Sequence, residues 1–266
     1  MIKLIVSDID GTLIPYGASA LDPELFPRIR RLREKGVLFC PASGRQYHSL
    51  RRLFAPAADE IGFLCENGAV VFGPGAEDSA PVLRKIAMPR ADALALSRAI
   101  LDTPGCDVLI SGQNTSYVCA CSQDLIDDLR GRLGNNVRVV RDPSDIAEDI
   151  IKVSAFCPGG TDAAAKALTE PWGGPYHMAV AGPAWLDFTL ADKGTGLRGL
   201  CDALGVPLSG VMAFGDNWND VPMLSLAGTA YLMAGADSAL RERFPLHCEG
   251  VIPVLDALLD ALSQIT

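Results

Sequence analysis

Short apolar runs alternate with segments of helical periodicity through the first and last thirds of the chain. Residues 3–7, Lys-Leu-Ile-Val-Ser, have an apolar centre bounded by charged residues, which is typical of a short buried strand. Residues 23–34 begin with the proline of an Asp-Pro pair, a helix-start signal, and their apolar positions recur at helical spacing. The same alternation predicts strands at 37–40, 61–65, 69–72, 211–214 and 229–233, and helices at 45–54, 194–204, 218–226, 238–243 and 254–262. Strands alternating with helices predict an α/β, doubly wound parallel sheet, a Rossmann-like core.

The pattern changes between about residues 89 and 184, where strands come in pairs between helices. The predicted strands are 107–111, 115–120, 137–141, 150–157 and 176–180, and the predicted helices are 90–102, 123–133 and 161–170. Paired strands indicate an α+β module with a sheet of its own. We therefore expect a core built from residues 1–84 and 185–266, with an inserted cap domain over residues 85–184.

Composition narrows the function classes. The chain has 266 residues and a net charge of -9. An acidic protein repels the phosphate backbone, so we expect no nucleic-acid partner. No apolar run approaches the roughly 20 residues of a membrane span, and no signal-peptide cleavage pattern is present, so we expect a cytoplasmic protein without a membrane partner. The eight cysteines are too sparse for a disulfide framework.

The first candidate for chemistry is the segment of residues 8–12, where a buried strand ends. Asp8 and Asp10 flank a single residue, and Gly11 lets the backbone turn. Two like charges this close need a cation or a shared proton. Mg²⁺ is the hard cation that suits carboxylates together with phosphate oxygens. The alternative is a purely structural turn built from Asp and Gly.

Three further polar motifs follow predicted strands or precede predicted helices. Ser43 and Gly44 lie between a strand and a helix, an arrangement that suits phosphate but also suits a plain helix cap. Lys193 precedes a helix and can reach a phosphate as a point charge. Residues 215–220 crowd two carboxylates, Asp216 and Asp220, and two amides at another strand end. Each motif alone is a weak indication of function. Their occurrence in this order along the chain is a much more specific one.

Together these motifs resemble the haloacid dehalogenase-like superfamily of phosphohydrolases. Residues 8–12 are similar to its first motif, Ser43 to its second, Lys193 to its third and residues 215–220 to its fourth. Residues 65–69, Cys-Glu-Asn-Gly-Ala, resemble a turn of the Cof-like sugar-phosphatase branch, which also inserts an α/β cap between the second and third motifs. The resemblance covers nearly the whole chain, although the cap matches in architecture alone.

The resemblance implies a role for each residue. Asp8 would be the nucleophile and Asp10 the general acid and base. Mg²⁺ would lie on Asp8, on the backbone carbonyl of Asp10 and on Asp216. The residues implied in binding the phosphoryl oxygens are Ser43, Gly44, Lys193 and Asn219. Asp220 would orient Lys193 or a metal-bound water.

The implied activity is a Mg²⁺-dependent phosphatase that hydrolyses a small phosphomonoester, such as a sugar phosphate, through an aspartyl-phosphate. Two alternatives stay open: a phosphomutase of the same superfamily and a non-catalytic sensor of a phosphorylated metabolite. In each case the partner is a small phosphorylated metabolite, and the chain is a monomer or a homodimer. The sequence names neither the substrate nor the cap residues that select it.

Overall fold

The computed structural model describes residues 1–119, 121–181 and 183–264. Its contacts divide the chain into two compact units, which we call the core and the cap. The core comprises Met1–Ser43, Leu53–Arg84 and Asp192–Thr266, and the cap comprises Gly44–Arg52 and Lys85–Ala191. Compared with the range expected from the sequence, the contacts also group residues 44–52 and 185–191 with the cap.

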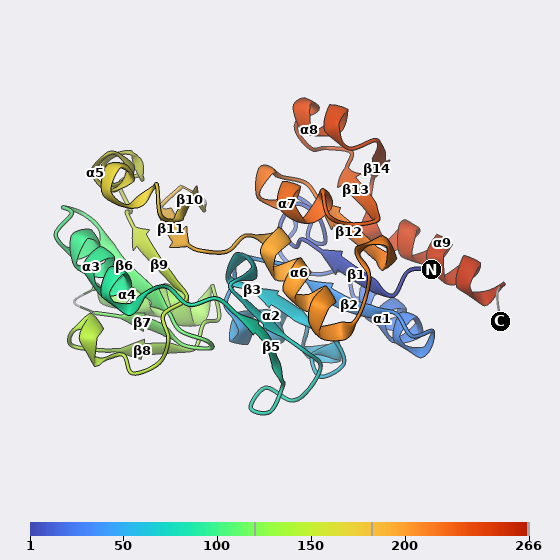
Figure 1. Cartoon of the computed structure of the whole chain (residues 1–266), viewed down its shortest axis with the longest axis horizontal. Helices are drawn as coiled ribbons and strands as arrows, with labels where there is room; N and C mark the ends of the chain where they lie inside the picture. The colour runs from blue at the N-terminus through green and yellow to red at the C-terminus, as the bar shows by residue number, and fades with distance from the viewer. Residues whose placement is uncertain (120, 182, 265–266) are drawn as a thin grey trace. The chain divides into compact units, whose positions relative to one another are not determined.

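The core is built on a five-stranded sheet in the order β14-β13-β12-β1-β2, whose paired neighbours all run parallel (Figure 1). Its strands are β1 (Leu4–Ser7), β2 (Leu38–Pro41), β12 (Val211–Gly215), β13 (Thr229–Met233) and β14 (Leu246–Cys248). All four residues of β1 are buried. A parallel sheet that is covered on both faces requires such continuous apolar strands, which explains why the apolar runs predicted them.

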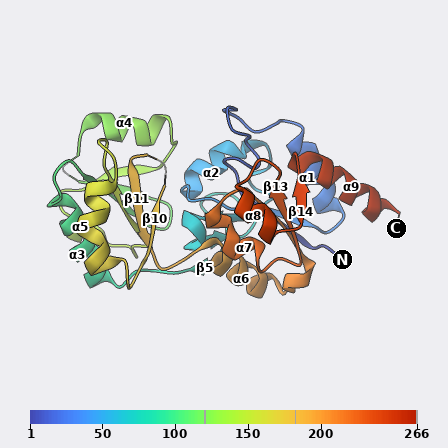
Figure 2. The same ribbon diagram turned by 90° about the horizontal axis from the view of Figure 1, so that it is seen from above.

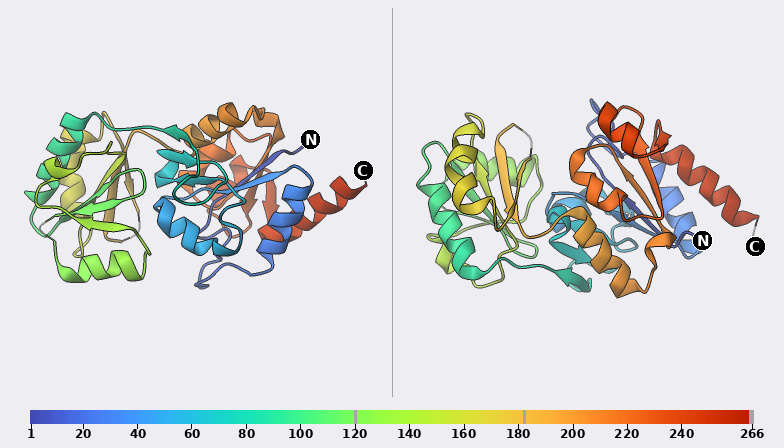
Figure 3. Two further views of the ribbon diagram at one scale, coloured as in Figure 1. Left: turned by 90° about the horizontal axis from the view of Figure 1, so that it is seen from below. Right: turned by 45° about the horizontal axis from the view of Figure 1, so that its top comes forward.

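Helices cover both faces of this sheet. The helices α6 (Lys193–Leu204), α7 (Val221–Leu224) and α8 (Ser238–Arg243) share one apolar cluster with β1, β12 and β13. The helices α1 (Leu25–Glu34) and α9 (Val251–Ser263) pack against each other, and α1 also contacts β2 (Figures 2 and 3). This is the predicted doubly wound α/β architecture. None of the helices that the described residues form combines the length and apolar composition of a membrane span.

A smaller sheet extends the core beyond β2. It contains β3 (Phe63–Cys65), β4 (Val70–Phe72) and β5 (Val82–Lys85). β3 and β4 pair antiparallel around the predicted turn at Glu66–Gly68. A parallel bridge between Ala42 and Leu64 joins this sheet to the chain just after β2. Among the described residues, short 3-10 helices form at η1 (Ala55–Ala57), η2 (Glu66–Gly68), η3 (Pro143–Asp145), η4 (Leu208–Gly210) and η5 (Trp218–Asp220).

The cap has its own six-stranded sheet in the order β10-β11-β9-β6-β7-β8. Its strands are β6 (Asp107–Ser111), β7 (Ser116–Val118), β8 (Val137–Val139), β9 (Lys152–Phe156), β10 (His177–Val180) and β11 (Trp185–Thr189). The helices α3 (Arg90–Leu101) and α5 (Asp162–Trp172) cover one face, and α4 (Gln123–Gly131) packs on the other. The helix α2 (Tyr47–Leu53) also contributes most of its residues to this unit.

Three strands were not predicted: β5, β11 and β14. β14 has three residues between two helices, which is too short for a pattern. β11 carries Asp187 at its centre, and this charge interrupts the apolar run. The structure pairs the Asp187 carboxylate with the Lys152 amine at 3.2 Å, and both side chains are buried. The partner that makes a charge acceptable inside the sheet lies on another strand, so the local sequence does not reveal it.

Candidate active site

The predicted site residues of the core follow strands that are neighbours in the sheet. Asp8 directly follows β1, Ser43 comes shortly after β2, and Asp216 directly follows β12. β1 pairs in parallel with both β2 and β12, so the carboxyl ends of the three strands lie at one edge. Ligands of open parallel sheets bind at this edge. The topology therefore brings together residues that are far apart in the sequence.

Asp8, Asp216 and Asp220 form a compact cluster of buried carboxylates. Each offers an oxygen that lies within 4.8 Å of the others. No other group of three His, Cys, Asp or Glu residues among the described ones has this spacing. Carboxylate oxygens are ligands that Mg²⁺ prefers, so the donor chemistry of the cluster fits the implied metal.

The Lys193 amine lies inside this cluster. Lys193 is the first residue of α6 and is 1% exposed. Asp192 caps the helix by accepting a hydrogen bond from the Thr195 amide at 2.7 Å. The Lys193 amine donates to the Asp8 carboxylate and, at 2.6 Å, to Asp220. The capped start of α6 thus holds a cation between two of the three carboxylates.

Asp220 is held in place by the loop that follows β12. Its carboxylate accepts hydrogen bonds from the amides of Asp216 at 3.0 Å and Asn217 at 3.1 Å. Gly215 allows the Asp220 side chain to lie this close to the end of β12, because a Cβ on Gly215 would lie 2.6 Å from the Cβ of Asp220. Both carboxylate oxygens of Asp220 therefore accept hydrogen bonds, one from the Lys193 amine and the other from the loop amides. Its predicted role in orienting Lys193 stays a prediction, with this contact as its basis.

The electrostatics of the cluster leave a surplus of negative charge. Burial raises the pKa of Asp8 to about 7, since the charges of Asp220 and Asp216 add to the burial cost and outweigh the help of Lys193. Burial acts to lower the pKa of Lys193, but the charges of Asp220 and Asp8 outweigh it and raise that pKa. Lys193 is thus a cation at neutral pH. A divalent cation would neutralise the remaining charge and favour the ionised form of Asp8.

Asp216 is oriented by two hydroxyl groups that the sequence did not single out. The Thr12 hydroxyl donates to Asp216 Oδ1 at 2.9 Å, and the Tyr16 hydroxyl donates to Oδ2 at 2.7 Å. The hydrogen bond to Asp216 is the main cause that raises the pKa of Tyr16 to about 12. Gly11 has a φ of 97°, and a Cβ on it would lie 2.3 Å from Asp216 Oδ2. Thr12 could have been found as part of the first motif, whereas Tyr16 carries no local signal.

Ser43 is held by the turn of residues 66–68. Its amide donates to the Leu64 carbonyl at 3.0 Å, and its carbonyl accepts from the Asn67 amide at 2.9 Å. Asn67 has a φ of 54°, an unusual value for a residue other than glycine, and its side-chain oxygen is buried without a hydrogen-bond partner among the described residues. Strained backbone of this kind is concentrated at functional sites. The turn therefore joins the second motif to the rest of the site.

The same turn packs directly against the start of α6. Gly68 has a φ of 95°, and a Cβ on it would lie 2.2 Å from the carbonyl oxygen of Asp192. We expect Gly68→Ala to lower the free energy of unfolding by about 3 kcal/mol or more, because strain and collision combine. Urea unfolding measures this change. The change should also displace the Lys193 amine from the carboxylate cluster, because Lys193 directly follows Asp192.

Gly205 offers the matched control for that measurement. It also has a positive φ, 64°, but a Cβ there meets nothing within 4 Å. Gly205→Ala should therefore cost only the backbone strain, about 1 kcal/mol. Equal losses in the two variants would show that the close approach to Asp192 is not important.

The remaining predicted residues are less closely tied to the carboxylate cluster. Asp10 is exposed, and its side chain is not part of the cluster. Asn219 is also exposed, on the loop between Asp216 and Asp220. Gly44 groups with the cap, where its carbonyl accepts a hydrogen bond from the Lys152 amine at 3.2 Å. The structure thus gathers Asp8, Lys193, Asp216 and Asp220 most tightly.

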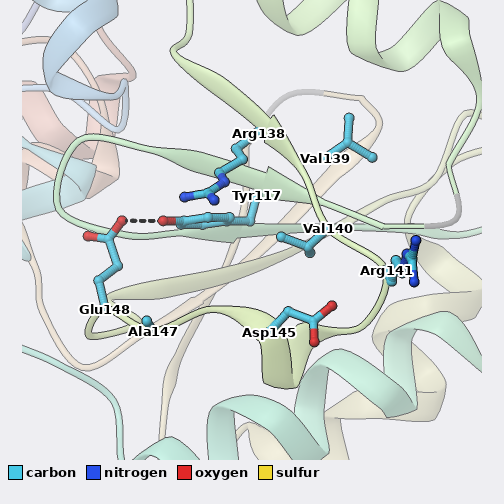
Figure 4. Close-up of a pocket in the computed structure, with 8 residues that line it drawn as sticks. All are labelled: Tyr117, Arg138, Val139, Val140, Arg141, Asp145, Ala147 and Glu148. Carbon is cyan, nitrogen blue, oxygen red and sulfur yellow. Dashed lines mark hydrogen bonds between the residues drawn. The ribbon is translucent and has the colours of Figure 1, made fainter.

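The cap contains a separate cavity of about 550 Å³ (Figure 4). Its lining consists of Tyr117, Arg138, Val139, Val140, Arg141, Asp145, Ala147 and Glu148. The Glu148 carboxylate is already engaged, since it accepts from the Tyr117 hydroxyl at 2.6 Å and from the Gln113 amide at 2.8 Å. The lining mixes both signs of charge and includes none of the predicted site residues, so we do not assign the active site to it.

Comparison with known proteins decides the family. The sequence profile of the haloacid dehalogenase-like hydrolases matches residues 5–248, a stretch that includes all four motifs. The chain belongs to this family. This haloacid dehalogenase-like hydrolase is 29% identical to a 5-amino-6-(5-phospho-D-ribitylamino)uracil phosphatase of Escherichia coli, over 97% of this chain and 96% of the relative. The predicted superfamily is therefore confirmed, and the hydrolase is a phosphatase.

Solved structures agree with this assignment. A protein of Eubacterium rectale is 31% identical, with a TM-score of 0.85 over 97% of this chain and 99% of the other. A sugar phosphatase of haloacid dehalogenase subclass IIB is 21% identical, with a TM-score of 0.76 over 99% of this chain and 98% of the other. At this identity the second likeness concerns the fold alone. The haloacid dehalogenase-like core with an inserted cap is the fold expected from the sequence.

Proposed function

We propose that this phosphatase hydrolyses a small phosphomonoester, with Asp8 as the nucleophile and Mg²⁺ as the cofactor. The observation that carries the proposal is the environment of Asp8. Its carboxylate is buried at the end of β1, accepts a hydrogen bond from the Lys193 amine, and has an oxygen within 4.8 Å of carboxylate oxygens of Asp216 and Asp220. A carboxylate placed among positive and metal-binding groups can approach an anionic phosphoryl group without prohibitive repulsion.

The reaction proceeds in two displacements. A carboxylate oxygen of Asp8 attacks phosphorus, the bond from phosphorus to the leaving oxygen breaks, and an aspartyl-phosphate forms. Asp10 protonates the leaving alkoxide and then, as a carboxylate, takes a proton from the attacking water. The second displacement releases inorganic phosphate and restores Asp8. The exposure of Asp10 supports this role, because it can exchange protons with solvent.

The other residues of the site balance charge. The oxygens of the transferring phosphoryl group carry negative charge that hydrogen-bond donors held in place can stabilise. The residues that bind these oxygens are Ser43, Gly44, Lys193 and Asn219. Mg²⁺ would be held by Asp8, the backbone carbonyl of Asp10, and Asp216. The hydroxyl groups of Thr12 and Tyr16 orient Asp216. When bound, the metal supplies positive charge to the nucleophile and the phosphate together.

The substrate class we propose is a phosphate ester of a sugar or of a polyol. The Escherichia coli relative is named for a substrate with a phosphorylated ribityl chain, and the subclass IIB neighbour is named a sugar phosphatase. Both names describe a phosphate on a hydroxylated carbon chain. The fold by itself does not select among such compounds.

A panel of phosphate esters tests the activity and the need for metal. Phosphate release is measured from ribitol phosphate, hexose phosphates, nucleotides and an aryl phosphate, with Mg²⁺ and with a chelator. We expect turnover with Mg²⁺, a loss of at least about 100-fold with the chelator, and the highest kcat/KM on a sugar or polyol ester. Turnover that requires a sugar bisphosphate would favour a mutase. A folded protein inactive on the whole panel would favour the sensor.

Metal binding should also be coupled to a proton. The pKa of Asp8 is raised to about 7 in the metal-free protein, so below that pH the cation must displace a proton from Asp8. We expect Mg²⁺ affinity to fall by up to about tenfold per pH unit below 7, with release of a proton to a weakly buffered solution. Calorimetry in buffers of different ionisation enthalpy measures the release. Equal affinity at about pH 6 and pH 8 would contradict the proposed ligand role of Asp8.

A further inference from the structure

Two cysteines of the cap face each other at the same end of two paired strands. Cys106 immediately precedes β6, and Cys157 immediately follows β9. β6 and β9 are antiparallel, and their register ends at the pair Asp107 and Phe156, so the next opposed pair is Cys106 and Cys157. Their Sγ atoms lie 2.7 Å apart, although the residues are separated by 51 positions in the sequence.

The backbone at this pair has the geometry that allows a cross-strand bond. The Cys106 amide donates to the Thr103 carbonyl at 3.2 Å, and the Cys157 amide donates to the Ala184 carbonyl at 2.7 Å. Neither amide bonds to the opposite cysteine, so this is a non-hydrogen-bonded pair. Such pairs bring the Cα atoms to about 4.5 Å, within the range of about 4.4–6.8 Å that disulfides span.

The two thiols differ in access. Cys157 is buried among the apolar residues of the cap, whereas Cys106 is half-buried beside the same cluster. Burial, followed by the hydrogen bond with Cys106, raises the pKa of Cys157 to about 12. Cys157 is thus protonated and shielded, and Cys106 is the thiol that a dissolved oxidant meets first.

We propose that Cys106 and Cys157 are an oxidation site at which a peroxide forms a reversible intramolecular disulfide. The Cys106 thiolate attacks a peroxide oxygen, the S–O bond forms, and the O–O bond breaks to release hydroxide, which takes up a proton. Cys157 then loses its proton and attacks the sulfur of the sulfenic acid, the S–S bond forms, and water leaves. Two thiols are oxidised in total, and one hydrogen peroxide is reduced to two waters.

The bond would join the two central strands of the cap sheet at one end. It would close a loop of 51 residues that contains β7, α4 and β8. A cross-link of this length restricts the unfolded chain considerably, while the folded strands already hold the cysteines in place. The oxidised cap should therefore resist unfolding more than the reduced cap, and a dithiol reductant should reverse the difference.

Mass spectrometry of the full chain tests the proposal. After treatment with a small excess of hydrogen peroxide, intact protein should lose two hydrogen atoms, two of its eight thiols should escape alkylation, and peptide mapping should link Cys106 to Cys157. The urea midpoint of the oxidised protein should rise by roughly 1 M. Cys106→Ser and Cys157→Ser should each abolish both changes. The matched control, Cys119→Ser with Cys121→Ser, should retain them.

Several results would overturn the proposal. A disulfide mapped to Cys119 and Cys121, or one between two chains on a non-reducing gel, would assign the oxidation elsewhere. Conversion of Cys106 to sulfinic acid without a cross-link would show that Cys157 does not reach it. Because Cys157→Ser alters a buried position, the half-buried Cys106→Ala variant keeps the test decisive if the former does not fold.

Discussion

Replacing Asp8 by asparagine should abolish phosphate release, with kcat lowered by at least about 10⁴-fold. The amide has nearly the shape of the carboxylate but lacks the charged oxygen that attacks phosphorus. The fold should survive the change. The pKa of Asp8 is raised to about 7 from 3.8, so its ionisation in the metal-free protein opposes folding as the pH rises between those values. The amide removes this cost.

The measurement is turnover of the best panel substrate, with circular dichroism to verify folding. Asp260→Asn provides a matched control, since Asp260 is an exposed residue of α9 far along the chain from the motifs. It should retain full activity. Turnover by a folded Asp8→Asn protein at the rate of the unmodified enzyme would show that another residue is the nucleophile.

Replacing Lys193 by methionine should both abolish turnover and destabilise the core. The amine is buried and donates to Asp8 and Asp220, so its removal leaves buried carboxylates without their cation. Loss of one member of a buried ion pair costs about 3–5 kcal/mol of unfolding free energy. Methionine has a similar length, which limits the contribution of a cavity. Urea unfolding of the metal-free protein measures the loss.

The pH dependence of this loss follows from the carboxylates. Without Lys193, the folded-state pKa of Asp8 rises further, since the amine is the main group that lowers it. When a carboxyl group has a higher pKa in the folded than in the unfolded state, the protein's free energy of unfolding falls as the pH increases above the unfolded pKa. The penalty should therefore be larger at about pH 8 than at about pH 5. Added Mg²⁺ should recover part of it. An exposed lysine of α5, Lys166, provides the control Lys166→Met, which should leave stability unchanged at both values.

A large part of the core could be predicted because its signals are local. The buried strands β1 and β12 consist largely of apolar residues, and each is followed at once by an aspartate, Asp8 or Asp216. In a parallel sheet the carboxyl ends of neighbouring strands meet at one edge, so the motifs by themselves indicated a shared site. The Asn-Gly turn after β3 was predicted for the same reason, since its backbone preference depends on adjacent residues.

Other features depend on partners that are distant in the sequence. Tyr16 is 78% exposed, and only the folded chain brings its hydroxyl to Asp216. In the sequence, Asp187 interrupts an apolar run. Only the folded chain places the Lys152 amine beside its carboxylate. Gly68 is recognisable as part of a turn, but its collision with Asp192 on replacement requires the packing of that turn on α6.

The sequence by itself therefore determined the α/β core through its apolar periodicity and the family through the likeness of its motifs, and it predicted an inserted cap and the candidate residues. These signals depend on residues that are close together along the chain. The tertiary structure alone decided that Asp220 and Asp8 share the Lys193 amine, that Thr12 and Tyr16 orient Asp216, and that Cys106 lies against Cys157. Each of these contacts joins segments brought together by strand pairing and helix packing. Their energies come from burial and charge, which the order of residues does not display.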